Sequence, residues 1–211
     1  MVQPQPQIPS SKGERTATRV LDAAQSLFAS HGFAGTSMSE IAAAAGIKKA
    51  SLYNHFKSKE ELYDAVLQRG FEPMLTVITE FLARGKEAYS NPRLIEPFFE
   101  RMAEMPDFAR LVQFEALQGG ERLKTLIGDM INQGARHGVQ ALKGSEHGKQ
   151  WSDQDLKHLI FASFALVSGY FTLAPMYELY LGASPEEHSS QAAYQQFLSR
   201  LWHQIWYIQP D

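Results

Sequence analysis

The sequence predicts an all-α fold, in which an N-terminal three-helix helix-turn-helix domain is joined by a connector helix to a C-terminal helical bundle. Apolar residues recur with helical spacing along most of the chain, and no alternating strand pattern interrupts them. Glycine, proline and polar stretches divide the chain into about nine helical segments. Apolar residues make up 44% of the 211 residues, which suffices for a packed core, and the lack of cysteine excludes disulfide scaffolds, zinc ribbons and thiol nucleophiles.

Residues 1–11 are predicted to form a flexible tail, because they contain three prolines, three glutamines and no charge. They lack the basic start and the apolar run of a secretory signal, so we expect a cytoplasmic protein. A helix of about fifteen residues follows and ends at His31-Gly32. Its apolar stripe consists of Val20, Ala24, Leu27 and Phe28.

Two capping-box sequences predict where later helices begin. Ser37 and Glu40 open a short helix at 41–45, which stops at Gly46. Another short helix covers about 48–56. Ser58 and Glu61 then open a longer connector helix that reaches about residue 82.

Breakers divide the rest of the chain into candidate helices at 94–105, 108–117, 121–142, 153–181 and 191–208. The predicted domains are the tail (1–11), a helix-turn-helix DNA-binding domain (12–59), the connector helix (60–84) and a ligand-binding and dimerisation domain (85–211). Residues 159–177 carry no formal charge and invite comparison with a membrane span. Polar residues and Pro175 interrupt this stretch and no Lys/Arg cluster flanks it, which favours a buried interface helix and no membrane partner.

The segment 41–56 has the layout of a helix-turn-helix. Small residues at 42–45 let two helices approach closely, and Gly46 suits a turn that a side chain would penalise. Ile47, Leu52 and Phe56 anchor the second helix to the first. The face left over carries donors and a ring suited to phosphates and base edges. An ordinary helical hairpin with a solvated polar face explains the same pattern equally well.

The wider context separates these alternatives. Residues from about 15 to 67 resemble the tetracycline-repressor (TetR) family. The resemblance consists of a first helix, then the sequence Gly-Phe-Ala-Gly-Thr-Ser-Met-Ser-Glu-Ile-Ala, and then the motif Ser51-Leu-Tyr-Asn-His-Phe-Lys-Ser-Lys59. The rest of the chain matches that family only in architecture. The resemblance implies a homodimeric transcriptional regulator that binds double-stranded operator DNA and a small-molecule effector.

The resemblance also assigns candidate DNA contacts. Lys48, Lys49 and Ala50 correspond to base-contacting positions, and Tyr53 to a phosphate or base contact. Ser51, Asn54 and His55 face the DNA backbone, and Thr36, Ser37 and Lys59 are phosphate contacts. The full predicted set is Thr36, Ser37, Lys48, Lys49, Ala50, Ser51, Tyr53, Asn54, His55 and Lys59.

The sequence leaves two interpretations open for Lys48 and for the basic residues of the first helix. Lys48 stands where the family commonly has a small capping residue, so it suggests a DNA contact, with a solvated side chain as the alternative. Lys12, Arg15 and Arg19 lie on or before the first helix. They suit backbone or minor-groove contacts, and equally a solvated face.

The last two predicted helices are candidates for a two-fold interface, because apolar residues cover more than one side of 153–181. A monomeric core is the alternative. The predicted interface residues are Leu156, Ile160, Val167, Tyr194, Phe197, Leu201, Trp202 and Ile205.

Aromatic and methionine residues of the C-terminal domain are candidates for an effector site, with plain core packing as the alternative. Lys and Arg are sparse near them, which favours an apolar or aromatic effector. The candidates are Phe98, Phe99, Met102, Phe108, Phe114, Phe161, Phe164, Tyr170, Phe171, Met176 and Tyr177.

Enzyme chemistry has no support in the sequence. The seven histidines show no metal-ligand spacing, and neither a nucleophile elbow nor a phosphate-binding glycine loop is present. We therefore predict no catalytic residues, no metal and no cofactor.

The sequence thus predicts a ligand-responsive regulator, a repressor that a small apolar or aromatic effector releases from a pseudo-palindromic operator. The alternatives are a DNA-binding protein without effector control, and a helical-bundle enzyme or carrier with an incidental helix-turn-helix. The net charge of −3 hides an asymmetry that favours the DNA-binding hypotheses. Residues 12–59 carry seven Lys and Arg against three Asp and Glu, and residues 60–211 carry thirteen against twenty.

Overall fold

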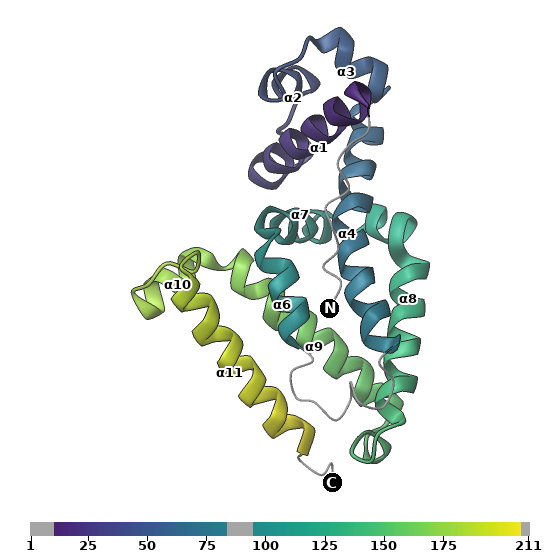
Figure 1. The fold of residues 1–211 in the computed structure, drawn as a ribbon, viewed down its shortest axis with the longest axis vertical. Helices are drawn as coiled ribbons and strands as arrows, with labels where there is room; N and C mark the ends of the chain where they lie inside the picture. The colour runs from purple at the N-terminus through teal and green to yellow at the C-terminus, as the bar shows by residue number, and fades with distance from the viewer. Residues whose placement is uncertain (1–10, 84–94, 208–211) are drawn as a thin grey trace. The chain divides into compact units, whose positions relative to one another are not determined.

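The computed structural model describes residues 11–83 and 95–207, and within these ranges it contains helices and no strand, which confirms the all-α prediction (Figure 1). The chain divides into two compact units, which meet in the sequence between Leu67 and Gln68. The N-terminal unit contains α1 (Lys12–His31), α2 (Met38–Ala44), α3 (Lys49–His55) and the start of α4 (Lys59–Ala83). The C-terminal unit contains the rest of α4, α6 (Ile95–Ala103), α7 (Pro106–Leu117), α8 (Glu121–Lys143), the 3₁₀ turn Gly148–Gln150, α9 (Asp153–Thr172), α10 (Ala174–Leu181) and α11 (His188–Tyr207).

Helix α1 is longer than predicted because its N-terminus is capped. The hydroxyl of Ser11 accepts a hydrogen bond from the backbone N–H of Glu14, and the Glu14 carboxylate accepts one from the backbone N–H of Ser11. This capping box starts the helix at Lys12 and extends it to 20 residues. Ser11 therefore belongs to the fold, and the remainder of the predicted tail lies outside the described residues.

The predicted cap of α2 is present, and the turn after α2 depends on glycine. Ser37 and Glu40 form the complete capping box. Gly46 has φ +64°, a left-handed conformation that a side chain would penalise. At the start of α4 the Ser58 hydroxyl accepts from the Glu61 N–H, but the Glu61 carboxylate accepts from Lys57, one residue earlier than a capping box requires.

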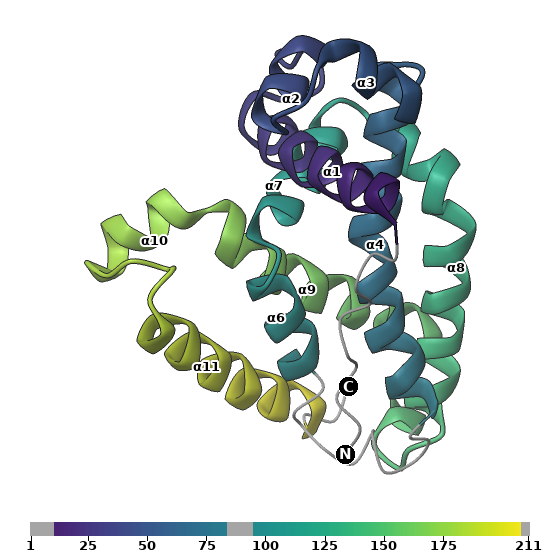
Figure 2. The ribbon, with the colours of Figure 1, turned by 45° about the horizontal axis from the view of Figure 1, so that its top comes forward.

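Helices α1, α2 and α3 of the N-terminal unit surround a small apolar core (Figure 2). Val20, Phe28, Ile41 and Leu52 are completely buried in it. The ring of Tyr63 on α4 packs edge-on against Phe28, with their centroids 4.8 Å apart. The apolar stripe of α1 and the anchor residue of α3 thus meet as their spacing predicts.

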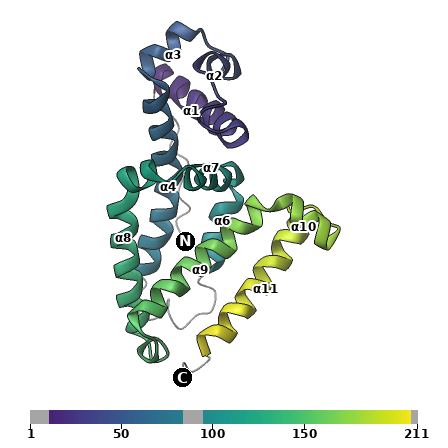
Figure 3. The ribbon, with the colours of Figure 1, turned by 180° about the vertical axis from the view of Figure 1, so that it is seen from behind.

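Helix α9 is the central element of the C-terminal unit and packs against α6, α7 and α8 (Figure 3). Helix α11 lies along α6. One core cluster joins the end of α8, the start of α9 and the end of α11 through Val139, Leu142, Leu156 and Trp206. The end of the last helix therefore packs where α8 ends and α9 begins.

The prediction of one continuous helix over 153–181 was wrong. The helix breaks at Leu173, and α9 and α10 are bent by 78° at the break. Pro175 lies in the first turn of α10, where its missing N–H and its ring are tolerated only because the preceding helix has ended. Among the described residues no single helix has the length and hydropathy of a membrane span, and α9 and α10 meet that test only when taken together.

Candidate nucleic-acid interface

Helix α3 presents most of the predicted DNA contacts on its exposed surface. Leu52 and Phe56 are buried and hold the helix against the rest of the unit. Tyr53 is 43% exposed even though it follows a buried leucine directly. Lys48, Lys49, Ala50 and Asn54 are also exposed, and Ser51 and His55 are half-buried. The seven-residue helix therefore combines an apolar anchor with a polar, basic outer surface.

Lys48 occupies the N-cap position of α3 and makes no side-chain capping bond there. A capping side chain usually contributes about 1 kcal/mol to a helix. This position instead carries an exposed cation beside a second one, Lys49. Lys48 therefore contributes no capping hydrogen bond to α3 and instead places a positive charge at the start of the helix.

Ser37 is exposed at the start of α2, and its side chain belongs to the capping box. Its hydroxyl accepts from the Glu40 N–H at 3.2 Å. The hydrogen bond from the Ser37 side chain, followed by that from its backbone N–H, lowers the pKa of Glu40 below its ordinary value. The capping box therefore keeps its ionised form at neutral pH, and its contribution to stability is lost only as the pH falls through the lowered pKa of Glu40.

Thr36 does not fit its predicted role as a phosphate contact. Its side chain is only 3% exposed, and its hydroxyl donates to the carbonyl oxygens of Gly32 and Leu27, at 2.9 and 3.2 Å. A hydroxyl has one proton to donate, and here it is used inside the fold. Thr36 closes the loop between α1 and α2, and the prediction for this residue is corrected accordingly.

Lys59 is also turned inward, toward the loop between α1 and α2. Its ammonium group donates to the carbonyl oxygens of Phe33 and Thr36, at 2.8 and 3.0 Å. The same Nζ atom lies 4.3 Å from the centroid of the Phe33 ring, within cation–π range. The first residue of α4 thus clamps the loop that leads into α2, and the phosphate contact of its third N–H stays a prediction.

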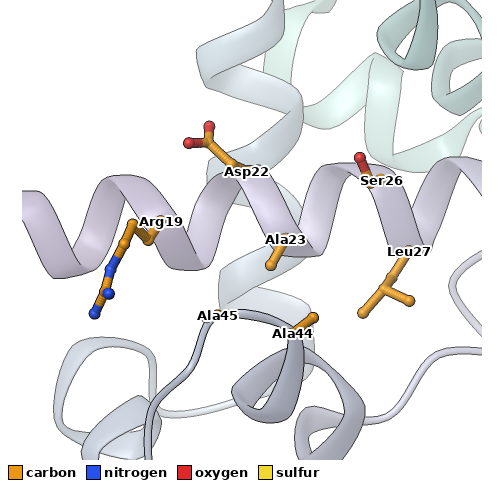
Figure 4. A pocket seen from close by; sticks show the side chains of 7 residues that line it. All are labelled: Arg19, Asp22, Ala23, Ser26, Leu27, Ala44 and Ala45. Carbon is orange, nitrogen blue, oxygen red and sulfur yellow. The ribbon is translucent and has the colours of Figure 1, made fainter.

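A shallow, open depression lies between α1 and the end of α2 (Figure 4). Small side chains, Ala23, Ala44 and Ala45, form much of its lining. The Arg19 side chain hangs over the α2 side of α1, and the Asp22 carboxylate points the opposite way (Figure 4). The sequence could not reveal this depression, because its two sides are at least 17 residues apart in the chain, from Leu27 to Ala44.

Four of the predicted effector-site residues, Phe99, Tyr170, Phe171 and Tyr177, gather in one aromatic cluster of the C-terminal unit. The Tyr170 ring centroid lies 5.3 Å from Phe99, 5.1 Å from Phe171 and 4.9 Å from Tyr177. Tyr194, predicted at the dimer interface, belongs to the same cluster at 4.6 Å from Tyr170. Burial, followed by the neighbouring Tyr177, raises the pKa of both Tyr170 and Tyr194.

The hydroxyl groups at the edge of this cluster are held by backbone carbonyls. Tyr170 donates to the carbonyl oxygen of Pro185 at 2.9 Å, and Tyr194 donates to that of Leu166 at 3.0 Å. These bonds connect α9 to α11 and to the loop that precedes it. The cluster therefore fixes the arrangement of these two helices as well as offering an apolar surface.

The other predicted effector-site residues lie elsewhere. The Phe108 ring packs on Gly70 and, at 4.8 Å, edge-on against Phe71, so it joins α7 to α4. Phe98 and Phe164 form a separate pair at 6.0 Å. Phe161 is 70% exposed and Met176 is also exposed, so neither lies among the buried rings. Met102 is buried and Phe114 half-buried, without a ring contact to the cluster.

Three of the predicted dimer residues lie inside their own subunit. Leu156 and Val167 are completely buried and Trp202 nearly so, because α9 and α11 turn these positions toward α8 and α6. This is a correction: the apolar stripe that contains them packs within the chain. Phe197 is exposed, and Ile160, Tyr194, Leu201 and Ile205 are half-buried.

Several exposed apolar residues were not predicted as interface residues. They are Phe161 on α9, Leu173 at the break, and Leu179, Tyr180 and Leu181 on α10, of which Tyr180 is 80% exposed. The sequence shows that these residues are apolar. It does not show which of the two apolar sides of α9 the rest of the chain covers.

Helix α3 and its supporting helices, with an exposed basic surface after a left-handed glycine turn, define a DNA-binding transcriptional regulator of the helix-turn-helix class. Residues 20–66 match the model of the bacterial regulatory proteins of the tetR family. The HTH-type transcriptional regulator RutR of Escherichia coli O157:H7 is 31% identical over 166 residues, which cover 78% of each chain. The chain therefore belongs to the tetR family.

Further relatives and solved structures agree with this assignment. The biofilm operon icaADBC HTH-type negative transcriptional regulator IcaR of Staphylococcus aureus (strain Newman) is 35% identical over 82 residues, 39% of this chain and 43% of IcaR. The ketosteroid transcriptional regulator KstR2 of Mycobacterium tuberculosis has the same fold, with a TM-score of 0.66, 22% identity, and coverage of 89% of this chain and 93% of KstR2. FadR of Bacillus subtilis, solved in complex with stearoyl-CoA, has a TM-score of 0.63, 18% identity, and coverage of 88% and 96%.

Proposed function

We propose that this protein is an effector-responsive repressor, which binds a pseudo-palindromic operator as a homodimer through helix α3. The observation that carries the proposal is the division of α3 into a buried anchor and an exposed surface with Lys48, Lys49, Tyr53 and Asn54. Lysine and asparagine are suited to base edges, and tyrosine and serine to phosphates. The relationship to IcaR, a negative regulator, supports repression as the outcome of binding.

The proposed DNA contacts are the predicted set without the two residues that are turned inward. Ser37 on α2 contacts a phosphate, and the residues of α3 and its N-cap enter the major groove. In a homodimer the two α3 helices must lie about 34–36 Å apart to occupy successive turns of one duplex face. The contact residues are Ser37, Lys48, Lys49, Ala50, Ser51, Tyr53, Asn54 and His55.

The proposed dimer surface is the exposed apolar side of α9, α10 and α11. Phe161, Leu179, Tyr180 and Phe197 carry large apolar side chains on it. Exposed aromatic and aliphatic residues of this size are typical of an interface. A two-fold contact through this side would cover them and leave the buried positions of α9 in the subunit core.

The proposed effector is a small apolar or aromatic molecule that binds beside the aromatic cluster of Phe99, Tyr170, Phe171, Tyr177 and Tyr194. These rings present apolar faces, with tyrosine hydroxyls at the edge. FadR of Bacillus subtilis, which shares this fold, was solved in complex with stearoyl-CoA, a molecule with a long apolar chain, and this supports an apolar ligand here. Effector binding would shift α4 and alter the separation of the two α3 helices.

Replacing both Lys49 and Tyr53 with alanine should weaken operator binding about 30-fold or more, because each base or phosphate contact contributes about 1–3 kcal/mol. Operator fragments from the protein's own promoter region, titrated by fluorescence anisotropy, measure this effect. Circular dichroism and sedimentation should show unchanged helicity and dimerisation, since both side chains are exposed. Lys149→Ala, which removes an exposed lysine of the C-terminal unit, is the matched control. Undiminished binding by the double variant would refute the role of α3.

A screen of apolar and aromatic compounds by thermal shift should find a ligand that raises the melting temperature, because it binds the native state selectively. The same ligand should weaken operator binding by about 5–150-fold, the usual range of allosteric coupling. The Lys49→Ala, Tyr53→Ala double variant should still be stabilised by the ligand, which separates effector binding from DNA binding. If operator binding responded to no compound in the screen, the protein would instead be a DNA-binding protein without effector control.

A further inference from the structure

Arg19 is an exposed cation on α1, at the edge of the depression between α1 and α2. Within the described residues, its guanidinium group has no hydrogen bond or ion pair. The nearest acidic residue lining the depression, Asp22, directs its carboxylate away from it (Figure 4). The charge of Arg19 is therefore available to an external anion.

The depression extends from Arg19 to the end of α2, shortly before the recognition helix in the sequence. Its far side is formed by Ala44 and Ala45 at the end of α2. Lys48, the N-cap of α3, follows Ala45 by three residues, so their Cα atoms are at most about 11 Å apart. On the α2 side the lining consists of two alanine side chains, which project little from the end of α2.

Two further cations extend the same side of α1. Lys12, Arg15 and Arg19 follow the i, i+3, i+7 spacing that places residues on one helical face, and all three are exposed. Glu14, the acidic residue closest to them in the sequence, has its carboxylate bonded to the backbone N–H of Ser11. This face therefore presents positive charge next to the turn that introduces α3.

We infer that Arg19 binds a phosphodiester group of the operator backbone, at the edge of the major groove that α3 enters. The inference rests on the proposed function and adds a contact outside the helix-turn-helix segment itself. The planar guanidinium group offers two parallel N–H donors, which match two oxygens of one phosphate. The small side chains of Ala44 and Ala45 allow a DNA backbone to come close, where a larger residue would hold it away.

The test is the salt dependence of duplex binding by an Arg19→Gln variant. Each phosphate contact contributes about 0.9 to the slope of log K against log salt concentration. The variant should lose about this amount of slope and bind about five-fold more weakly near 0.15 M salt. The loss should be equal for the operator and for an unrelated duplex, because a phosphate carries no sequence information.

Two control variants define the expected result. Arg19→Lys should retain the slope, because it keeps the charge, and should lose part of the affinity together with the bidentate geometry. Arg200→Gln removes an exposed arginine from α11 and should change neither slope nor affinity. All three variants should melt at the wild-type temperature, since both arginines are exposed.

The outcomes separate this inference from the proposed function. An Arg19→Gln variant with the wild-type slope would overturn the inference alone, provided that the Lys49 and Tyr53 changes still weakened operator binding. A wild-type protein that bound no duplex would overturn both. Inorganic phosphate at matched ionic strength should not raise the melting temperature. An increase that required Arg19 would mean that the site takes a free anion, and the assignment to DNA would be wrong.

Discussion

Replacing Lys59 with methionine should lower the free energy of unfolding by about 3 kcal/mol, because two charge-assisted hydrogen bonds disappear and two carbonyl groups lose their donor. Operator binding should weaken as well, since the loop from Phe33 to Thr36 leads directly into Ser37 and α2. The salt dependence of the remaining binding should equal that of the wild type. Methionine keeps much of the aliphatic stem, so the loss reports the ammonium group.

Lower stability together with an unchanged salt dependence of DNA binding distinguishes a structural role of Lys59 from a phosphate contact. Loss of a phosphate contact would reduce the slope of log K against log salt by about 0.9 and leave the unfolding free energy unchanged. Chemical denaturation and salt-dependent anisotropy measure the two quantities on the same sample. Lys57→Met, an exposed lysine two residues away, serves as the control. Lys59→Arg should recover part of the stability, because arginine can donate to the same carbonyls. A lower slope with unchanged stability would restore the role that the family resemblance implies.

Replacing Leu156 with alanine should destabilise the subunit by about 2–5 kcal/mol, the usual cost of a large cavity in a packed core. Leu156 is completely buried in the cluster with Val139, Leu142 and Trp206. The expected result is a lower midpoint of denaturant unfolding and no direct effect on association of the folded subunits.

Replacing the exposed Phe161 with glutamate should leave the stability of the subunit unchanged and weaken the association of subunits. The free subunit should keep its fold, because 70% of this residue is already exposed to solvent. In the proposed dimer, however, a carboxylate would be buried in an apolar interface, so sedimentation should show dissociation to monomers. Operator affinity should fall with it, since two half-sites need two linked subunits.

The matched control is Ile131→Glu, the same kind of change at an exposed apolar residue of α8, which lies outside the proposed interface. It should leave the dimer intact. If Leu156→Ala instead released folded monomers while Phe161→Glu remained dimeric, the interface would follow the apolar stripe that the sequence suggested and the proposed surface would be wrong.

Much of the fold is visible in the sequence because its signals are local. The capping box of Ser37 and Glu40 acts across three residues, and the left-handed turn at Gly46 depends on that residue alone. Leu52 anchors α3 because the helical spacing of this short segment places its side chain on the buried side. The exposed basic surface of α3 follows from the same short-range spacing. The break at Leu173 could also have been predicted, from Pro175, but the long apolar pattern concealed it.

The sequence by itself determined the all-α class, the helix-turn-helix and the family, since these depend on patterns within a few residues and on one contiguous motif. Only the tertiary structure decided that Lys59 points inward, because the carbonyls that it binds are 23 and 26 residues away. It also decided that Leu156 lies in the core while Phe161 is exposed. Both residues belong to a helix that is apolar on more than one side, and the side that becomes buried depends on where α8 and α11 pack, which no local pattern specifies.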